Sequence, residues 1–238
     1  MVGWVIPGGG SGWRPRLRVE RLMGLAVLAA EVPERRGWDG KGTERGCRAA
    51  ARQLRRKGCR RVLAPEGFSY WPQLRQAGLS PVWAGGMCAA LAGPLAEAAL
   101  VQRGKDPLQS SVLLRGGRVD QDLFRAALFL CPKVRRLSLW AGEEGEELAR
   151  YLQRTYGVPM LSPGPGWRPD VTVDLSPAEE GGDLVLCGER PALGALSLTA
   201  EKLPDGPDRL SLLALLWETG RVKTDEIEII TSSKGQMT

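Results

Sequence analysis

Short apolar runs alternate along the chain with stretches in which apolar residues recur at helical spacing. The apolar runs predict strands at 2–6, 61–64, 111–115, 134–140, 158–161, 171–175, 184–187, 195–199 and 226–231. The helical spacing predicts helices at 16–29, 44–57, 72–77, 86–103, 120–130, 143–156 and 208–219. Alternation of this kind is typical of βαβ units. The pattern therefore predicts an α/β fold in two lobes, with a mainly parallel sheet and helices on both faces.

A break at Lys105-Asp-Pro107 divides the predicted elements into two groups. We expect an N-terminal α/β lobe over residues 1–105 and a C-terminal lobe over residues 106–231. The polar residues 232–238 are expected to form a flexible tail.

The basic residues are concentrated in the first lobe. The chain has 33 Lys and Arg against 27 Asp and Glu, and residues 1–61 hold 15 of the former and 5 of the latter. A basic excess suits phosphates or an acidic partner, although GC-rich coding DNA also produces arginine. Arg48, Arg52, Arg55 and Arg56 share one face of a predicted helix, but no aromatic residues are interleaved with them to stack on bases. Nucleic acid is therefore not the expected partner, and it stays only as a second alternative.

The sequence contains no histidine and five cysteines. Without imidazole, Ser-His-Asp and Cys-His nucleophiles and histidine-ligated metals are excluded. The cysteines form no CxxC pair and have no zinc-like spacing, so no metal site is expected. Three of them lie in or beside apolar runs, which favours reduced, buried thiols and a cytoplasmic protein. No leader and no run long enough to span a bilayer are recognised, so we expect a soluble protein with no membrane contact.

The second lobe has a distinctive order of elements. A strand leads through Gly116-Gly117 into a helix, and a strand, a second helix and another strand follow. The next strand ends at Asp174-Leu-Ser176-Pro177. Together with the Ala-rich helix and Lys-Asp-Pro break before it, this order over residues 86–178 resembles the NAD(P)-binding Rossmann domain of shikimate dehydrogenase and glutamyl-tRNA reductase. The resemblance implies a Rossmann-like fold, NAD(P) as the cofactor, and a site at Gly116, Gly117, Arg118, Asp174 and Ser176.

The glycine motif of this resemblance is degenerate. If Gly116 is the first glycine of the fingerprint, the second position holds Arg118 and the third holds Gln121. A Rossmann site needs small residues there so that the backbone can approach the pyrophosphate. Asp174 is better explained by an Asp-x-Ser-Pro turn that caps the next segment. A second glycine cluster, Gly8 to Gly12, lacks the Gly-Lys-Ser/Thr of a phosphate-binding loop and is interpreted as a connector.

Three functions follow. The first is a nucleotide or small-molecule binder with an eroded NAD(P) site. The alternatives are a catalytically inactive interaction or regulatory module, and nucleic-acid binding through the basic first lobe. An open polar cleft lined by Gly116, Arg118 and Asp174 would favour the binder, whereas filling by Trp140, Met160 or Trp167 would favour the inactive module. Catalytic residues, enzymatic activity and oligomeric state are left open.

Overall fold

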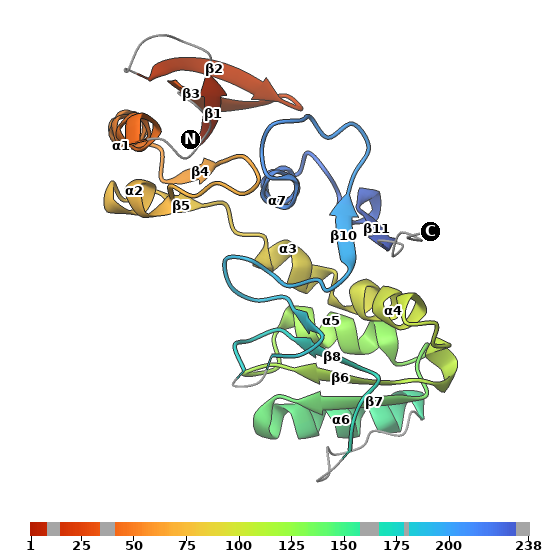
Figure 1. The fold of residues 1–238 in the computed structure, drawn as a ribbon. Coiled ribbons are helices and arrows are strands. Elements are labelled where there is room, and N and C mark those ends of the chain that lie inside the picture. Colours follow the sequence, from red (N-terminus) through yellow and green to blue (C-terminus); the bar gives the residue numbers. More distant parts are fainter. Residues whose placement is uncertain (9–14, 34–40, 158–166, 179–180, 232–238) are drawn as a thin grey trace. The chain divides into compact units, whose positions relative to one another are not determined.

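The computed structural model describes residues 1–8, 15–33, 41–157, 167–178 and 181–231, and the chain folds into two compact units (Figure 1). Unit 1 consists of Met1–Trp83 and Ala200–Lys223, and unit 2 of Ala84–Thr199 and Thr224–Thr238. The boundary expected near residue 105 lies inside unit 2. The division into lobes of residues 1–105 and 106–231 stays a prediction. The predicted tail, 232–238, and the strand predicted at 158–161 lie outside the described residues.

Unit 1 is built on a five-stranded sheet of order β2-β3-β1-β4-β5. Its strands are β1 (Val2–Gly8), β2 (Arg16–Leu22), β3 (Leu25–Pro33), β4 (Arg61–Leu63) and β5 (Ser80–Pro81). All neighbouring pairs are parallel except the hairpin of β2 and β3. The helices of this unit are α1 (Lys41–Arg56), α2 (Trp71–Gln76) and α7 (Arg209–Glu218). In Figure 1, α1 and α7 lie on opposite sides of the strands.

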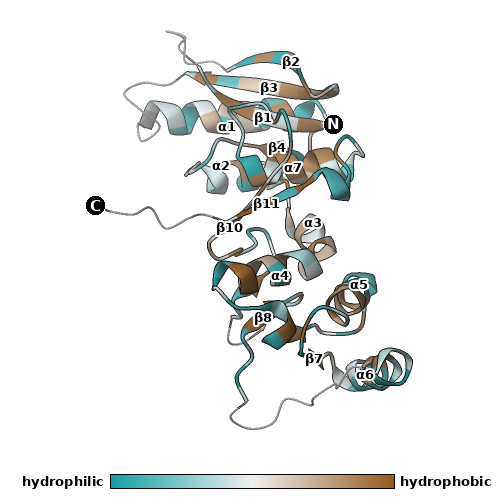
Figure 2. Ribbon diagram, turned by 90° about the vertical axis from the view of Figure 1, so that its right-hand side faces the viewer, coloured by the Kyte–Doolittle hydropathy of each residue, from teal (hydrophilic) through white to brown (hydrophobic). Residues whose placement is uncertain are grey.

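The core of unit 1 follows the two-residue period of its strands. Val5, Leu28 and Val62 are buried in one cluster with Leu54 of α1. The strand residues of opposite parity, among them Ala29 and Leu63, are also buried. Both faces of a strand are covered only when helices flank the sheet on both sides, and Figure 2 shows β1 and β3 as mainly hydrophobic.

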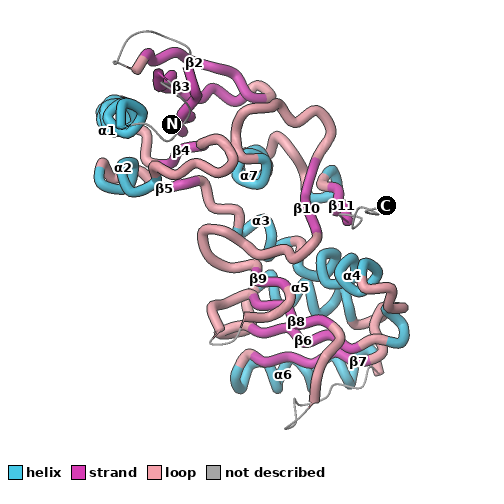
Figure 3. Tube along the Cα trace, viewed as in Figure 1, coloured by secondary structure: helices cyan, strands magenta, loops and turns pink. Residues whose placement is uncertain are grey.

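Unit 2 contains a four-stranded parallel sheet of order β7-β6-β8-β9. The strands are β6 (Ser111–Arg115), β7 (Arg136–Trp140), β8 (Val171–Asp174) and β9 (Leu184–Val185). The flanking helices are α3 (Gly85–Ala90), α4 (Ala92–Gln102), α5 (Gln121–Leu130) and α6 (Gly142–Tyr156), with a short 3-10 turn, η1 (Pro107–Gln109), before β6 (Figure 3). An antiparallel pair of β10 (Leu196–Thr199) and β11 (Glu228–Thr231), the latter preceded by η2 (Thr224–Glu226), completes the unit. The predicted α/β class with mainly parallel sheets and flanking helices is confirmed.

The helix predicted over 16–29 is wrong, because this segment forms the β2–β3 hairpin. The apolar and polar residues of Leu17-Arg18-Val19-Glu20 alternate with a period of two, which is the strand period. The turn is Met23-Gly24, and both residues have positive φ, 48° and 79°. Two positive φ values are typical of the tight turns whose twist matches that of a hairpin.

The single helix predicted over 86–103 consists of two helices in the structure. Helices α3 and α4 meet at Leu91. Pro94 lies in the first turn of α4, where its missing N–H would have had no partner in the helix. A Cβ on Gly93 would lie 2.7 Å from Phe129, so this glycine allows α5 to pack closely on α4.

Replacing Met23 with Asn should stabilise unit 1. A non-glycine residue in the left-handed region is strained, and Asn-Gly is a preferred sequence for this turn. We expect Met23→Asn to raise the free energy of unfolding by about 0.5–1 kcal/mol, measured by urea denaturation. Val19→Asn, at an exposed position of β2 outside the turn, is the control. A loss of stability in Met23→Asn would show that the turn has another conformation.

Candidate functional site

The order of the unit 2 sheet places a topological switch point between β6 and β8. From β6 the chain goes to β7 on one side, and it then returns to β8 on the other side of β6. In open α/β sheets, ligands bind outside the carboxyl ends of the strands at such a point. Arg115 and Asp174 are the last residues of these two strands and are paired in the register of the sheet.

Arg115 and Asp174 form a bidentate ion pair at this position. Arg115 Nε donates to Asp174 Oδ1 at 2.6 Å, and Arg115 Nη2 donates to Asp174 Oδ2 at 2.9 Å. The Asp174 side chain is 1% exposed and that of Arg115 is 20% exposed. A charge pair this deeply buried loses much hydration, and only paired, hydrogen-bonded geometry of this kind compensates for the loss.

Gly182 completes the coordination of the Asp174 carboxylate. Its amide donates to Asp174 Oδ2 at 2.5 Å. A Cβ at this position would lie 2.9 Å from the Thr172 carbonyl oxygen and 3.0 Å from Asp174 Oδ2, so only glycine allows this approach. Sequence reasoning identified Asp174 but missed Arg115 and Gly182. An arginine that ends a strand of four buried residues was the available signal for Arg115.

The predicted site residues are placed around the same carboxyl edge. A Cβ on Gly117 would lie 3.9 Å from Ser176 Oγ, so the glycine turn and the loop after β8 are neighbours. Arg118 is exposed. The amide of Gly116 donates to the Trp140 carbonyl at 2.9 Å, and a Cβ on Gly116 would lie 2.6 Å from Leu123 Cδ1. Gly116 is therefore explained by the packing of α5, and the binding role of all five residues is a proposal.

Backbone amides around the glycine turn donate hydrogen bonds to carboxylates of the protein itself. Asp120 Oδ1 accepts from the amides of Asp122 and Leu123 at 3.1 and 2.9 Å, and Asp120 is thus the N-cap of α5. Glu144 Oε2 accepts from the Val119 amide at 2.8 Å. Burial, together with the charge of Asp120, raises the pKa of Asp122 against the lowering effect of Arg125. A bound anion at the amino end of α5 would lie beside the negative charge of Asp120. Rossmann domains hold pyrophosphate at the corresponding helix end.

The structure describes two of the three residues that were expected to fill a cleft. Trp140 is 59% exposed at the end of β7, Trp167 is half-buried, and Met160 lies outside the described residues. Residues 9–12 of the first glycine cluster also lie outside them. A shallow hollow of about 360 Å³ follows the later turns of α6 and is lined by Glu147, Arg150, Tyr151, Arg154 and Thr155.

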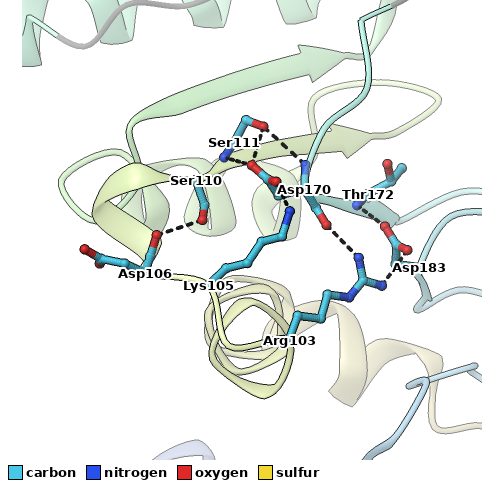
Figure 4. A network of polar contacts seen from close by, with 8 residues as sticks. All are labelled: Arg103, Lys105, Asp106, Ser110, Ser111, Asp170, Thr172 and Asp183. Carbon is cyan, nitrogen blue, oxygen red and sulfur yellow. Dashed lines mark hydrogen bonds and ion pairs between the residues drawn. The ribbon is translucent and has the colours of Figure 1, made fainter.

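The amino ends of β6 and β8 carry a second polar network (Figure 4). Asp170 accepts from both the amide and the hydroxyl of Ser111 at 2.8 Å and forms an ion pair with Lys105. Arg103 donates to the Asp170 carbonyl and to Asp183, both at 2.6 Å, and Asp183 accepts from the Thr172 amide at 2.7 Å. These contacts bind the end of α4 to both strands and are structural.

The cysteines are free thiols. Burial raises the pKa of Cys47, with a further contribution from Glu44, and that of Cys88, in each case to about 12. Near the candidate site, burial and then the charge of Asp174 raise the pKa of Cys187, although a backbone hydrogen bond lowers it. Thiols with raised pKa values are poor nucleophiles.

Within the described ranges, no three Cys, Asp or Glu side chains are grouped so that they could hold a metal ion. None of the helices in that part of the chain is long and apolar enough to cross a membrane.

Comparison with known proteins adds little to this geometry. No protein-family model and no curated protein matches the chain. Among solved structures, the L-tryptophan dehydrogenase from Nostoc punctiforme is similar at 13% identity and a TM-score of 0.30, over 63% of this chain and 44% of that one. A match at this level carries no conclusion about the site. The strand order and switch point are those of doubly wound α/β units, the class that includes Rossmann-like folds.

Asp174→Asn should strongly destabilise the protein, because it leaves the Arg115 charge partly buried without its counter-ion. We expect a loss of about 3–5 kcal/mol in the free energy of unfolding, measured by urea denaturation. Asp225→Asn, an identical change at an exposed position, is the control. The double variant Arg115→Met with Asp174→Leu should recover most of the loss. Equal effects of Asp174→Asn and Asp225→Asn would contradict the buried pair.

Asp170 should contribute to acid sensitivity. Burial raises its pKa, but the hydrogen bond from Lys105, those from Ser111 and the Lys105 charge together hold the pKa below its ordinary value of 3.8. The folded state therefore favours the ionised carboxylate, so its contribution is complete above that ordinary value and is lost as pH falls through the lowered pKa. Between about pH 5 and pH 2, the melting temperature of Asp170→Asn should fall less steeply than that of the unmodified protein. Parallel curves would refute this role.

Proposed function

We propose that this protein binds a small polar ligand at the carboxyl edge of the unit 2 sheet, beside Gly117, Arg118 and Ser176. The observation that carries the proposal is the buried Arg115–Asp174 pair at the switch point between β6 and β8. A buried ion pair is weak evidence for a stability role, because apolar residues of similar volume often stabilise a core better. Its position at the ligand-binding edge of the sheet favours a role in binding.

Each residue has a distinct part in this proposal. Asp174 and the Gly182 amide hold Arg115 in a fixed orientation. The Ser176 hydroxyl offers a donor and an acceptor next to Gly117, and Arg118 supplies an exposed positive charge. Such a site suits a ligand with one anionic group, such as a mononucleotide or a small carboxylic acid.

A dinucleotide held in the manner of NAD(P)-dependent enzymes does not fit these residues. The turn has Arg118 where the second glycine is needed, and Asp120 and Glu144 already accept from amides at its helix end. A pyrophosphate would therefore have to replace bound carboxylates. Hydride transfer from NAD(P) is not part of the proposal.

The inactive interaction module is the second candidate. The occupied amides of Val119, Asp122 and Leu123 favour it, because they use for internal structure the groups that a Rossmann enzyme offers to its cofactor. If this candidate is correct, the protein is folded but binds none of the small-molecule probes.

Thermal unfolding with defined probes tests the proposal. AMP, malate, NAD and NADP are added at millimolar concentration, where a ligand present at about 100 times its Kd stabilises the fold by about 2.7 kcal/mol. We expect AMP or malate to raise the melting temperature, and NAD and NADP to act no more strongly than AMP. No shift with any probe would reject the site and favour the interaction module.

Two variants locate the binding. Arg118→Ala and Ser176→Ala should each weaken binding of the active probe at least about tenfold, the loss of roughly one hydrogen bond to a charged group, as measured by isothermal titration calorimetry. Arg136→Ala is the matched control, because it removes an exposed arginine at the amino end of β7 in the same sheet. Equal weakening in all three variants would indicate non-specific attraction.

A further inference from the structure

The two units carry opposite net charges. Unit 1 contains 20 Lys and Arg against 10 Asp and Glu, whereas unit 2 contains 13 against 17. In each unit, part of the imbalance is concentrated on one helix. These helices are α1, after β3, and α6, after β7.

Helix α1 has a basic face. It consists of the exposed residues Arg45, Arg48, Arg52, Arg55 and Arg56, continued by Lys57. Of these, Arg48 is paired with Glu44 at 2.5 Å, and no described acidic side chain forms an ion pair with Arg52, Arg55 or Arg56. The opposite side of the helix, with Cys47, Ala50, Ala51 and Leu54, is fully buried. The basic face therefore points away from the core.

This arrangement is unfavourable in the isolated chain. Arginines three and four positions apart, such as Arg52 with Arg55 and with Arg56, repel one another on a helix. A solvated helical face normally mixes the two signs of charge. An acidic surface placed on the basic face would relieve this repulsion.

Helix α6 carries the complementary surface. Its acidic face consists of the exposed residues Glu143, Glu144, Glu146 and Glu147, and Figure 2 shows α6 as mainly hydrophilic. Arg150 and Arg154 follow on the same helix. Favourable interaction with the helix dipole accounts for some of these acids, but it leaves four negative charges within five residues exposed.

We propose that the basic face of α1 in one molecule binds the acidic face of α6 in a second copy of this chain. Aligning Glu143–Glu147 with Arg52–Lys57 brings the amino end of α6 to the carboxyl end of α1. The opposite partial charges of these two helix ends also attract one another. The spacing of three and four residues is shared by both faces, so several pairs form at once.

The aromatic residues near α1 favour a protein partner over single-stranded nucleic acid. Phe68 is 6% exposed, and it packs edge-on against Tyr70 and Trp71. Tyr70 and Trp71 also contact the unit 1 core. These rings are therefore committed to the fold and do not form a stacking platform for bases.

Complementary half-variants test the contact. The first is Arg52→Gln, Arg55→Gln and Arg56→Gln, and the second is Glu143→Gln, Glu146→Gln and Glu147→Gln. Glu144 is left unchanged because it accepts from the Val119 amide. Each variant retains one half of the interface, so neither should self-associate, but a mixture should form a 1:1 complex of twice the 25.8 kDa chain mass.

Sedimentation velocity provides the measurement. The unmodified protein should associate in about 50 mM salt and dissociate in about 500 mM, where charges are screened beyond a few ångströms. The control Arg16→Gln, Arg18→Gln and Arg21→Gln removes three exposed charges from β2 of the same unit and should associate like the unmodified protein. Circular dichroism spectra that match those of the unmodified protein show that each variant is folded.

Two results would overturn the proposal. One is a mixture of the half-variants that remains monomeric while the unmodified protein associates. The other is an unmodified protein that remains monomeric in low salt, and binding of a DNA duplex that is lost in the triple-arginine variant would then assign the basic face to nucleic acid. Gly117, Arg118, Ser176 and Glu144 are unchanged in every variant, so either result leaves the proposed function untouched.

Discussion

The bidentate bond between Arg115 and Asp174 is the contact on which the carboxyl edge of unit 2 depends. It joins the ends of β6 and β8, the two strands at the switch point of the sheet. Asp174 is almost fully buried, so its charge requires all the donors that the structure supplies. The Gly182 amide is one of them, and its approach requires a residue without a side chain. One buried carboxylate thus determines the orientation of Arg115 and the course of the segment that leads into β9.

Internal carboxylates distinguish the glycine turn from a dinucleotide site. In Rossmann enzymes, the free amides at the first helix hold pyrophosphate. Here Asp120 and Glu144 accept from three of the amides in this region, and Arg118 stands where close approach of the backbone is needed. The described residues thus place protein carboxylates where a Rossmann enzyme holds the phosphates of its cofactor. A fold of this class therefore indicates the position of a ligand site, but it does not identify the ligand.

Charge is also divided along the chain. The basic face of α1 and the acidic face of α6 lie on different units, and both are exposed because the opposite sides of the helices are packed in cores. At the other edge of the unit 2 sheet, Lys105, Arg103, Asp170 and Asp183 neutralise one another within a compact network (Figure 4). Paired charges of this kind are structural, whereas most charges of the two helix faces are exposed to solvent.

The sequence by itself determined the α/β class and most of the strands and helices. These follow from local spacing and from hydrogen bonds between near neighbours. The β2–β3 hairpin was misread as a helix, because its two positive φ angles at Met23 and Gly24 have only a weak signature in sequence. Asp174 was recognised as a candidate, but its pairing with Arg115 joins residues 59 positions apart. Only the parallel register of β6 and β8 brings these charges together, and burial in the folded sheet then makes their pairing obligatory.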